Sequence, residues 1–275
     1  MSPELIRIGP LTLYWYGFLI TVGALAGAYV ASLQAKRKGI DPEHVWNALI
    51  PALIFGLIGA RLYHVLSSPP GGVGLDYYRQ NPLDIIAFWN GGLRGLGIYG
   101  AILGGGFGVW LYCRFAHLPF LTFLDIASPG LALAQTIGRF GNYFNQELYG
   151  YPTTLPWGIP IDLQHRLPQF ADLPLETRFH PTFLYEALLN LLLFVALIYI
   201  SRRWESWLRS GDIFLIYLIG YSLIRFTIEF QRPDAWTIGG LPTAQWLAIL
   251  IAAVSAIILI VRHRIQLPEQ SGGRA

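Results

Sequence analysis

Long apolar stretches recur along almost the whole chain, and a lipid bilayer leaves few ways to fold such a sequence. Seven of them approach the length of about 20 mainly apolar residues that a helix needs to cross the hydrocarbon core. They cover residues 12–35, 45–66, 97–115, 120–138, 182–201, 211–230 and 243–261. Of the 275 residues, 54% are hydrophobic and only 13% are charged. We therefore predict an all-α integral membrane protein with seven transmembrane helices.

Little of the chain remains for a soluble domain. We expect a single membrane-embedded domain over residues 1–275, with small outer-face loop regions at about 67–96 and 139–181. The first apolar stretch lacks a basic leader and is longer than the ~7–15 apolar residues of a signal peptide, so we expect it to remain as a span. The single cysteine, Cys113, excludes an internal disulfide.

The positions of Lys and Arg predict the orientation, because cytoplasmic loops are enriched in both. An N-terminus outside and a C-terminus in the cytoplasm place ten of them on the inner side: Lys36, Arg37, Lys38, Arg114, Arg202, Arg203, Arg209, Arg262, Arg264 and Arg274. Six fall on the outer side, in longer loops: Arg7, Arg79, Arg94, Arg166, Arg178 and Arg232. The net charge of +3 therefore reflects membrane orientation, and we expect no nucleic-acid partner.

A cluster of polar residues ends the fourth apolar stretch, in the sequence Gly138-Arg139-Phe140-Gly141-Asn142-Tyr143-Phe144-Asn145-Gln146-Glu147-Leu148-Tyr149-Gly150. Ionisable residues at membrane depth usually face a bundle interior or a water-filled cavity, and they mark functional sites. Arg139, Asn142 and Tyr143 have i, i+3 and i+4 spacing, which puts them on one face of a helix. This face is our first candidate for a binding site.

Further charges inside the apolar stretches fall at the same predicted depth. Arg61 lies near the outer end of the second stretch, and Tyr221, Arg225 and Glu229 form an i, i+4, i+8 stripe on the sixth. An Arg–Glu pair that only neutralises itself inside the bundle remains an alternative for this stripe. Two or three arginines at one depth with few acids nearby would bind a phosphate, because guanidinium groups present planar donors to its oxygens. An anionic lipid headgroup fits this description.

Other features have simpler explanations. The glycines at 100, 104 and 108 form overlapping G-x-x-x-G repeats, which favour close helix packing. Tyr16 is compatible with an interfacial aromatic belt. Glu186, close after His180-Pro181, can complement a helix dipole. Zinc-protease, nucleophile-elbow and Walker A motifs are not found in the sequence, so we expect neither a metal nor a cofactor.

Taken together, these residues resemble the prolipoprotein diacylglyceryl transferase family. The resemblance rests on the 138–150 sequence and covers nearly the whole chain. Its other motifs are Ile8-Gly9-Pro10, Trp15-Tyr16-Gly17, Gly59-Ala60-Arg61, Trp89-Asn90-Gly91-Gly92-Leu93, His180-Pro181-Thr182, Leu184-Tyr185-Glu186, Tyr221 through Glu229, and Arg232-Pro233-Asp234. Several separated motifs in the same order make the resemblance specific.

The resemblance implies roles for particular residues. Arg139 would bind the phosphate of phosphatidylglycerol, and the residues that shape or complete the cavity would be Asn142, Glu147, Gly150, Tyr16, Tyr221, Arg225 and Glu229. We place Arg61 with Arg139 and Arg225 as a lipid-binding residue. Many members of the family carry a histidine where this chain has Tyr99, so a histidine base is not expected here.

The function that the resemblance implies is transfer of diacylglyceryl from phosphatidylglycerol to the acceptor cysteine of a lipoprotein precursor with a signal peptide. The product would be a thioether, with release of sn-glycerol 1-phosphate, in the first step of lipoprotein maturation. The expected location is the bacterial cytoplasmic (inner) membrane, with the active site toward the outer leaflet. A transporter or flippase that binds anionic phospholipid is the alternative. It would need polar residues along an inner-leaflet path, and the apolar stretches offer few.

The distribution of Lys and Arg generates a prediction of topology. A reporter fused after Ala275 should be cytoplasmic, and one inserted near Asp162 should be external, because the basic residues gather on the side assigned to the cytoplasm. Paired fusions of a phosphatase active outside the cell and a fluorescent protein active inside it measure both positions. Reversed signals would contradict the predicted orientation.

Overall fold

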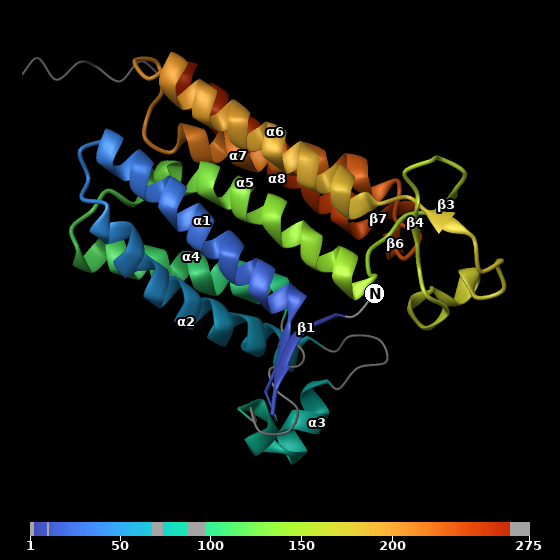
Figure 1. The fold of residues 1–275 in the computed structure, drawn as a ribbon. Helices are drawn as coiled ribbons and strands as arrows, with labels where there is room; N and C mark the ends of the chain where they lie inside the picture. Colours follow the sequence, from blue (N-terminus) through green and yellow to red (C-terminus); the bar gives the residue numbers. More distant parts are fainter. Residues whose placement is uncertain (1–2, 10, 68–73, 87–96, 265–275) are drawn as a thin grey trace, which may run out of the picture. The chain divides into compact units, whose positions relative to one another are not determined.

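A computed structural model describes residues 3–9, 11–67, 74–86 and 97–264 of the chain. Long helices dominate it (Figure 1), as the sequence predicts. They are α1 (Trp15–Arg37), α2 (Glu43–Leu66), α4 (Ile98–Phe115), α5 (Phe120–Asn145), α6 (Thr182–Arg203), α7 (Asp212–Glu229) and α8 (Thr243–Arg264). The Trp89–Leu93 motif, Arg94 and Arg274 lie outside the described residues.

Five of these helices are long and apolar enough to cross a membrane, namely α1, α2, α5, α6 and α8. The protein is therefore mostly helical and of membrane-spanning composition, as predicted. The other two predicted spans are also helices, but α4 is rich in glycine and α7 carries Asp212, Arg225 and Glu229. Glycine and charged side chains both lower the apolar character by which a span is recognised. The number of seven spans and the orientation stay predictions.

Two predicted boundaries are wrong, and both errors have a physical cause. Helix α5 continues past residue 138 to Asn145, so the outer loop begins later than the predicted residue 139, while Arg139, Asn142 and Tyr143 share a helix as their spacing predicted. Polar residues end an apolar run without ending a helix. At the N-terminus, residues 11–14 are not helical: β2 (Leu11–Tyr14) pairs antiparallel with β1 (Glu4–Ile8), and α1 begins at Trp15.

Contacts within the chain define two compact units, residues 1–31 with 124–275, and residues 32–123. The expectation of one membrane-embedded domain stays a prediction.

In the 32–123 unit, α2 packs against α4 along the glycines of α4: Gly104 faces the carbonyl of Phe55, and Gly108 faces that of Pro51. A Cβ at either glycine would overlap the facing backbone. This close approach confirms the packing role predicted for the G-x-x-x-G repeats. The unit also holds α3 (Leu75–Gln80) and η1 (Pro82–Ile85).

In the unit of residues 1–31 and 124–275, α1 approaches α5 through glycines. A Cβ at Gly23 would lie 2.9 Å from the carbonyl oxygen of Ala134, and one at Gly27 would lie 2.7 Å from that of Gly130. Helices α6, α7 and α8 complete this unit, with α7 packed against both neighbours. Ala132 of α5 joins Leu197, Ile213 and Tyr217 in a buried apolar cluster.

Residues 146–181, here called the arm, connect α5 to α6. The arm contains a three-stranded antiparallel sheet in the order β3 (Pro152–Thr153), β5 (Arg178–Phe179), β4 (Ile159–Pro160). Two 3-10 turns, η2 (Leu163–His165) and η3 (Pro168–Phe170), follow β4. A small apolar core of Tyr149, Ile161, Phe170 and Phe179 holds the arm together. A second hairpin, β6 (Thr237–Ile238) with β7 (Leu241–Pro242), links α7 to α8. These strands were not predicted, because two-residue strands leave no alternating pattern.

Candidate active site

A network of buried ion pairs joins the C-terminal end of α5, the N-terminal end of α6 and the C-terminal end of α7. Glu186 of α6 lies between two arginines: its Oε1 is 2.7 Å from Nη2 of Arg139, and its Oε2 is 3.3 Å from Nη1 of Arg225. Arg225 also donates from Nη2 to Oε2 of Glu229, at 2.7 Å. The Glu186 side chain is only 4% exposed. Three helices therefore meet at one carboxylate.

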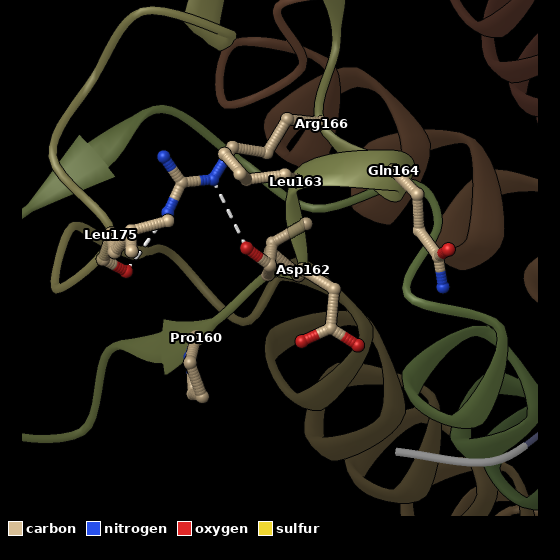
Figure 2. Close-up of a pocket in the computed structure, with 7 residues that line it drawn as sticks. Pro160, Asp162, Leu163, Gln164, Arg166 and Leu175 are labelled. Atoms are coloured by element: carbon tan, nitrogen blue, oxygen red, sulfur yellow. Dashed lines mark hydrogen bonds between the residues drawn. The ribbon is translucent and has the colours of Figure 1, made fainter.

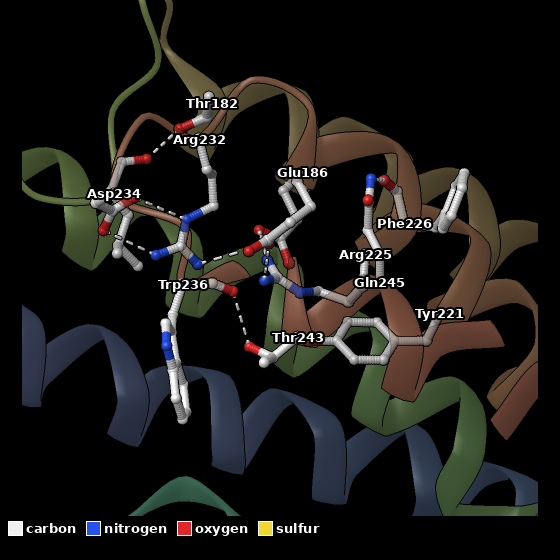
Figure 3. Close-up of polar contacts among 12 residues, drawn as sticks. Thr182, Glu186, Tyr221, Arg225, Phe226, Arg232, Asp234, Trp236, Thr243 and Gln245 are labelled. Carbon is white, nitrogen blue, oxygen red and sulfur yellow. Dashed lines mark hydrogen bonds and ion pairs between the residues drawn. The ribbon is translucent and has the colours of Figure 1, made fainter. Parts of the chain in front are cut away.

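Arg232 and Asp234 extend this network beyond the end of α7. Arg232 makes a two-pronged contact with Asp234, at 3.2 Å from Nε and 3.0 Å from Nη2, and its Nη1 lies 3.8 Å from Glu229. Figure 3 shows Arg225 and Arg232 on either side of the carboxylates of the network. Sequence reasoning had placed Arg232 in an outer loop and in a family motif, and had given Glu186 only a dipole role. Glu186 lies on α6, so its pairing with Arg139 and Arg225 cannot be read from spacing, whereas Arg232 follows Glu229 by three residues and precedes Asp234 by two.

The charges of this network are balanced, which corrects one expectation. The sequence suggested arginines with too few acids nearby, but Arg139, Arg225 and Arg232 contact Glu186, Glu229 and Asp234. Burial of unpaired charges is so costly that such residues are paired in folded proteins. Glu186 comes from α6, Glu229 from α7 and Asp234 from the segment after α7, so only Glu229 shares an apolar stretch with an arginine that it contacts.

The end of α5 and the residues after it form a second polar group beside the network. Asn142 donates to Oε1 of Glu147 at 2.9 Å, and Asn145 donates to the same oxygen at 3.2 Å. The backbone turns back directly after α5, with positive φ on both sides of Glu147: 52° at Gln146 and 55° at Leu148. Positive φ is uncommon for residues other than glycine and is retained where the surroundings hold it in place. The turn brings the Glu147 carboxylate back to Asn142.

The arm supplies the contacts that hold this turn. Gln146 is buried and its amide pairs with Asp162 in both directions: Nε2 donates to Oδ2 at 2.5 Å, and the Asp162 N–H donates to Oε1 at 2.7 Å. Thr182 donates through its hydroxyl to the Leu148 carbonyl. The hydrogen bond from Gln146 lowers the pKa of the Asp162 carboxyl below its usual value. Asp162 therefore remains a charged acceptor at neutral pH.

Gly150 lies where no side chain fits. Its N–H donates to the His180 carbonyl at 2.9 Å. A Cβ on this residue would lie 2.8 Å from Cβ of His180 and 3.0 Å from both the Gln231 carbonyl oxygen and Cγ2 of Thr182. Gly150 thus allows the chain after α5 to pack against the starts of two other segments.

Two tyrosines complete the group. Tyr221 of α7 lies with its hydroxyl 3.5 Å from Nη2 of Arg139, a long contact. Tyr16 of α1 packs against α5, because a Cβ on Gly141 would lie 2.7 Å from its ring. Tyr16 also lies within electrostatic range of Glu147 and Arg139. The structure therefore brings together eight of the predicted site residues: Arg139, Asn142, Glu147, Gly150, Tyr16, Tyr221, Arg225 and Glu229.

Arg61 and Tyr99 belong to the 32–123 unit. Arg61 donates from Nε to the carbonyl of Ile85 at 2.8 Å and from Nη2 to that of Asp84 at 2.5 Å, and it lies 5.4 Å from the ring centroid of Tyr78. Tyr99 is 45% exposed, and its ring centroid is 5.7 Å from that of Tyr63. Their predicted roles stay predictions.

The arm also carries a hollow of about 480 Å³, shown in Figure 2. Its lining includes Asp162, Gln164, Arg166 and Leu175, but none of the predicted site residues. Arg166 is buried and donates to the backbone carbonyls of Ile161, Leu173, Pro174 and Leu175, so it serves to fold the arm. Among the described residues, no group of three or more His, Cys, Asp or Glu side chains could hold a metal ion.

The fold and the site together define a multi-pass membrane protein with a buried arginine–carboxylate network at one end of its helices. A family model described as prolipoprotein diacylglyceryl transferase matches residues 3–261. The chain belongs to this family.

Curated relatives from distant bacteria agree. The phosphatidylglycerol–prolipoprotein diacylglyceryl transferase of Chloroflexus aggregans is 38% identical over 273 residues, covering 93% of this chain and 87% of the relative. The protein of that name from Synechococcus elongatus is 40% identical, covering 94% of this chain and 86% of the relative. The one from Streptococcus mutans is 36% identical and covers 96% of both chains.

The pairing of Gln146 with Asp162 generates a prediction. Gln146→Ala should lower the turnover number by about tenfold, equivalent to the loss of one or two hydrogen bonds, because the turn would no longer hold Glu147 against Asn142. The measurement is steady-state kinetics of the purified protein. Gln164→Ala is the matched control, since Gln164 is an exposed glutamine of the same arm. Equal turnover in both variants would contradict a positioning role for Gln146.

Proposed function

We propose that this protein transfers diacylglyceryl from phosphatidylglycerol to the cysteine thiol of a lipoprotein precursor. The cysteine sulfur attacks the glyceryl carbon that bears the phosphate ester, so a C–S bond forms and a C–O bond breaks. The leaving group is sn-glycerol 1-phosphate. The proton lost by the thiol balances the charge gained by the departing phosphate. The names of the relatives support this activity, and nothing in them favours the transporter or flippase alternative.

The contact of two arginines with one carboxylate is the observation that carries the proposal. Arg139 and Arg225 come from different helices, and each contacts a different oxygen of Glu186. The two non-bridging oxygens of a phosphodiester can be received in the same way, since guanidinium groups bind carboxylate and phosphate with similar geometry. Oriented cations in a site of low dielectric constant also stabilise the charge that develops on a leaving phosphate.

The other predicted residues take supporting roles in this proposal. Asn142, Glu147 and Gly150 shape the site beside Arg139, while Tyr16, Tyr221 and Glu229 complete the cavity and hold the arginines. Arg61 would contact the lipid as well. No metal or cofactor has a part in this reaction.

We further propose seven transmembrane helices, with the N-terminus outside and the C-terminus in the cytoplasm of a bacterium. The protein would lie in the cytoplasmic (inner) membrane, with its site toward the outer leaflet. The asymmetry of Lys and Arg supports this orientation. Both substrates are held by the membrane, so each would enter from the bilayer.

One assay tests the activity. The purified protein is incubated with phosphatidylglycerol and a peptide that carries a lipoprotein-type cysteine. Mass spectrometry should detect a diacylglyceryl adduct on the peptide, and an enzymatic assay should detect released glycerol phosphate in equal amount. Binding of phosphatidylglycerol without either product would contradict the transferase proposal and favour a transporter.

In this assay Arg139→Ala should lose about 100-fold or more in turnover, because one well-placed donor to the developing charge is worth about 10²–10³ in rate. Arg79→Ala is the matched control: Arg79 contacts Asp76 on the surface, with its side chain 70% exposed, and its loss should have little effect. Near-normal turnover of a folded Arg139→Ala protein would contradict its role at the phosphate.

Tyr99 stands where many family members have histidine, and it generates a further prediction. A phenol of pKa ≈ 10 is a poor base for a thiol of pKa ≈ 8.5, whereas free cysteine is already a few per cent thiolate at pH 7. Nearby arginines lower a thiol pKa further. Tyr99→Phe should therefore keep turnover within about tenfold of the parent, or ~1.4 kcal/mol.

The control for this substitution is Tyr199→Phe, at an exposed tyrosine of α6. The rate of thioether formation is measured for both variants, together with binding of phosphatidylglycerol. If Tyr99→Phe abolished the thioether while the lipid still bound, the phenol would have a chemical role and the thiol would need it for activation.

A further inference from the structure

We infer that Glu186 occupies the phosphate position of the site and exchanges with the lipid phosphate during each turnover. In the structure its carboxylate bridges Arg139 and Arg225. The phosphodiester of the lipid takes its place on binding, and its return promotes release of glycerol phosphate. This inference rests on the proposed function and assigns to Glu186 a role in binding and release.

The geometry of the bridge supports an exchange. Each oxygen of Glu186 contacts a different arginine, at 2.7 Å to Arg139 and at 3.3 Å to Arg225. Glu186 thus lies against the two guanidinium groups that a phosphodiester would need, accepting a hydrogen bond from Arg225 and forming an ion pair with Arg139. Arg225, shown beside Glu186 in Figure 3, has a second partner in Glu229 at 2.7 Å, which would hold it when Glu186 moves away. The carboxylate and the phosphate cannot both occupy these donors.

The charge balance of the network gives a second reason. Three arginines face three carboxylates in this cluster, Arg139, Arg225 and Arg232 against Glu186, Glu229 and Asp234. A phosphodiester carries one negative charge, as a carboxylate does, so the arginines keep the same number of anionic partners when the phosphate displaces Glu186 and that side chain turns away from them. Addition of the phosphate without movement of Glu186 would place excess negative charge in a buried site, which is strongly unfavourable.

Product release is the step at which this exchange matters. Cleavage converts the phosphodiester into a phosphate monoester, whose charge at pH 7 is about −1.5 to −2. Two arginines would hold this product more tightly than the substrate. Glu186 is attached to α6 beside the same donors and therefore competes at a high effective concentration. Its return weakens the hold of the arginines on the product.

Glu186→Gln tests the inference, because it keeps the shape of the side chain and removes its charge. The inhibition constants of sn-glycerol 1-phosphate and of inorganic phosphate should fall by about tenfold or more, since a charged competitor for the arginines is lost. The KM for phosphatidylglycerol should fall as well. Turnover should also fall, because the product would leave slowly. An unchanged or higher inhibition constant would mean that Glu186 only positions the arginines, and would overturn the inference.

Glu229→Gln is the charge-matched control. Glu229 contacts Arg225 and Arg232 but is not the bridge between Arg139 and Arg225. We expect the inhibition constants to fall much less in this variant than in Glu186→Gln. An equal fall in both variants would show that net charge alone sets phosphate affinity, and would overturn the inference.

Glu186→Asp carries the test if Glu186→Gln does not fold. Its carboxylate is withdrawn by one methylene group and competes less well, so the inhibition constants should again fall, and unchanged constants would overturn the inference.

Thioether formation by the parent protein distinguishes a failure of the exchange from a failure of the proposed function. If the parent forms no thioether, the proposed function fails. If it forms the thioether and the inhibition constants do not change in the variants, only the exchange fails.

Discussion

The contact of Glu186 with Arg139 and Arg225 is the interaction on which the rest of the site depends. It joins α5, α6 and α7 through one buried carboxylate. Removing one partner of a buried ion pair commonly costs about 3–5 kcal/mol, because the other charge remains buried and unpaired. The Glu186 carboxylate thus brings the two arginines together. An anion of similar size could bind between them if it replaced the carboxylate.

The residues after α5 depend on the arm in a comparable way. Gln146 and Leu148 have positive φ: Asp162 of the arm pairs with Gln146, and the hydroxyl of Thr182, the first residue of α6, donates to the Leu148 carbonyl. Glu147 lies between these two residues and reaches back to Asn142. The arm has its own apolar core and a buried arginine that binds four backbone carbonyls, so it is a rigid support. A region that looks like a surface loop in the sequence thus fixes the geometry of the site.

The helices could be predicted from the sequence because long apolar runs have few alternatives in a bilayer. The apolar run did not predict where α5 ends, because polar residues end the run while the backbone remains helical, but the spacing of Arg139, Asn142 and Tyr143 did indicate a helix there. Arg139, Arg225 and Glu229 were predicted from depth and spacing. Glu186 was missed as a member of the network because its partners Arg139 and Arg225 belong to other helices. Arg232 was missed because it follows the apolar stretch, although Glu229 and Asp234 lie within three residues of it. Spacing reveals which residues share a face, but not which faces meet.

Contacts at the opposite end of α7 hold the start of this helix and so help to fix the position of Arg225 along its axis. There Asp125 of α5 accepts the backbone N–H groups of Gly211 and Phe214 at 2.6 and 2.9 Å, and caps the start of α7. His263 of α8 contacts the buried Asp212 at 2.6 Å. With a rise of about 1.5 Å per residue, Arg225 lies about 20 Å along α7 from this anchor. Because these contacts do not involve Glu186, they would continue to hold the start of α7 during the proposed exchange of the carboxylate with a phosphate.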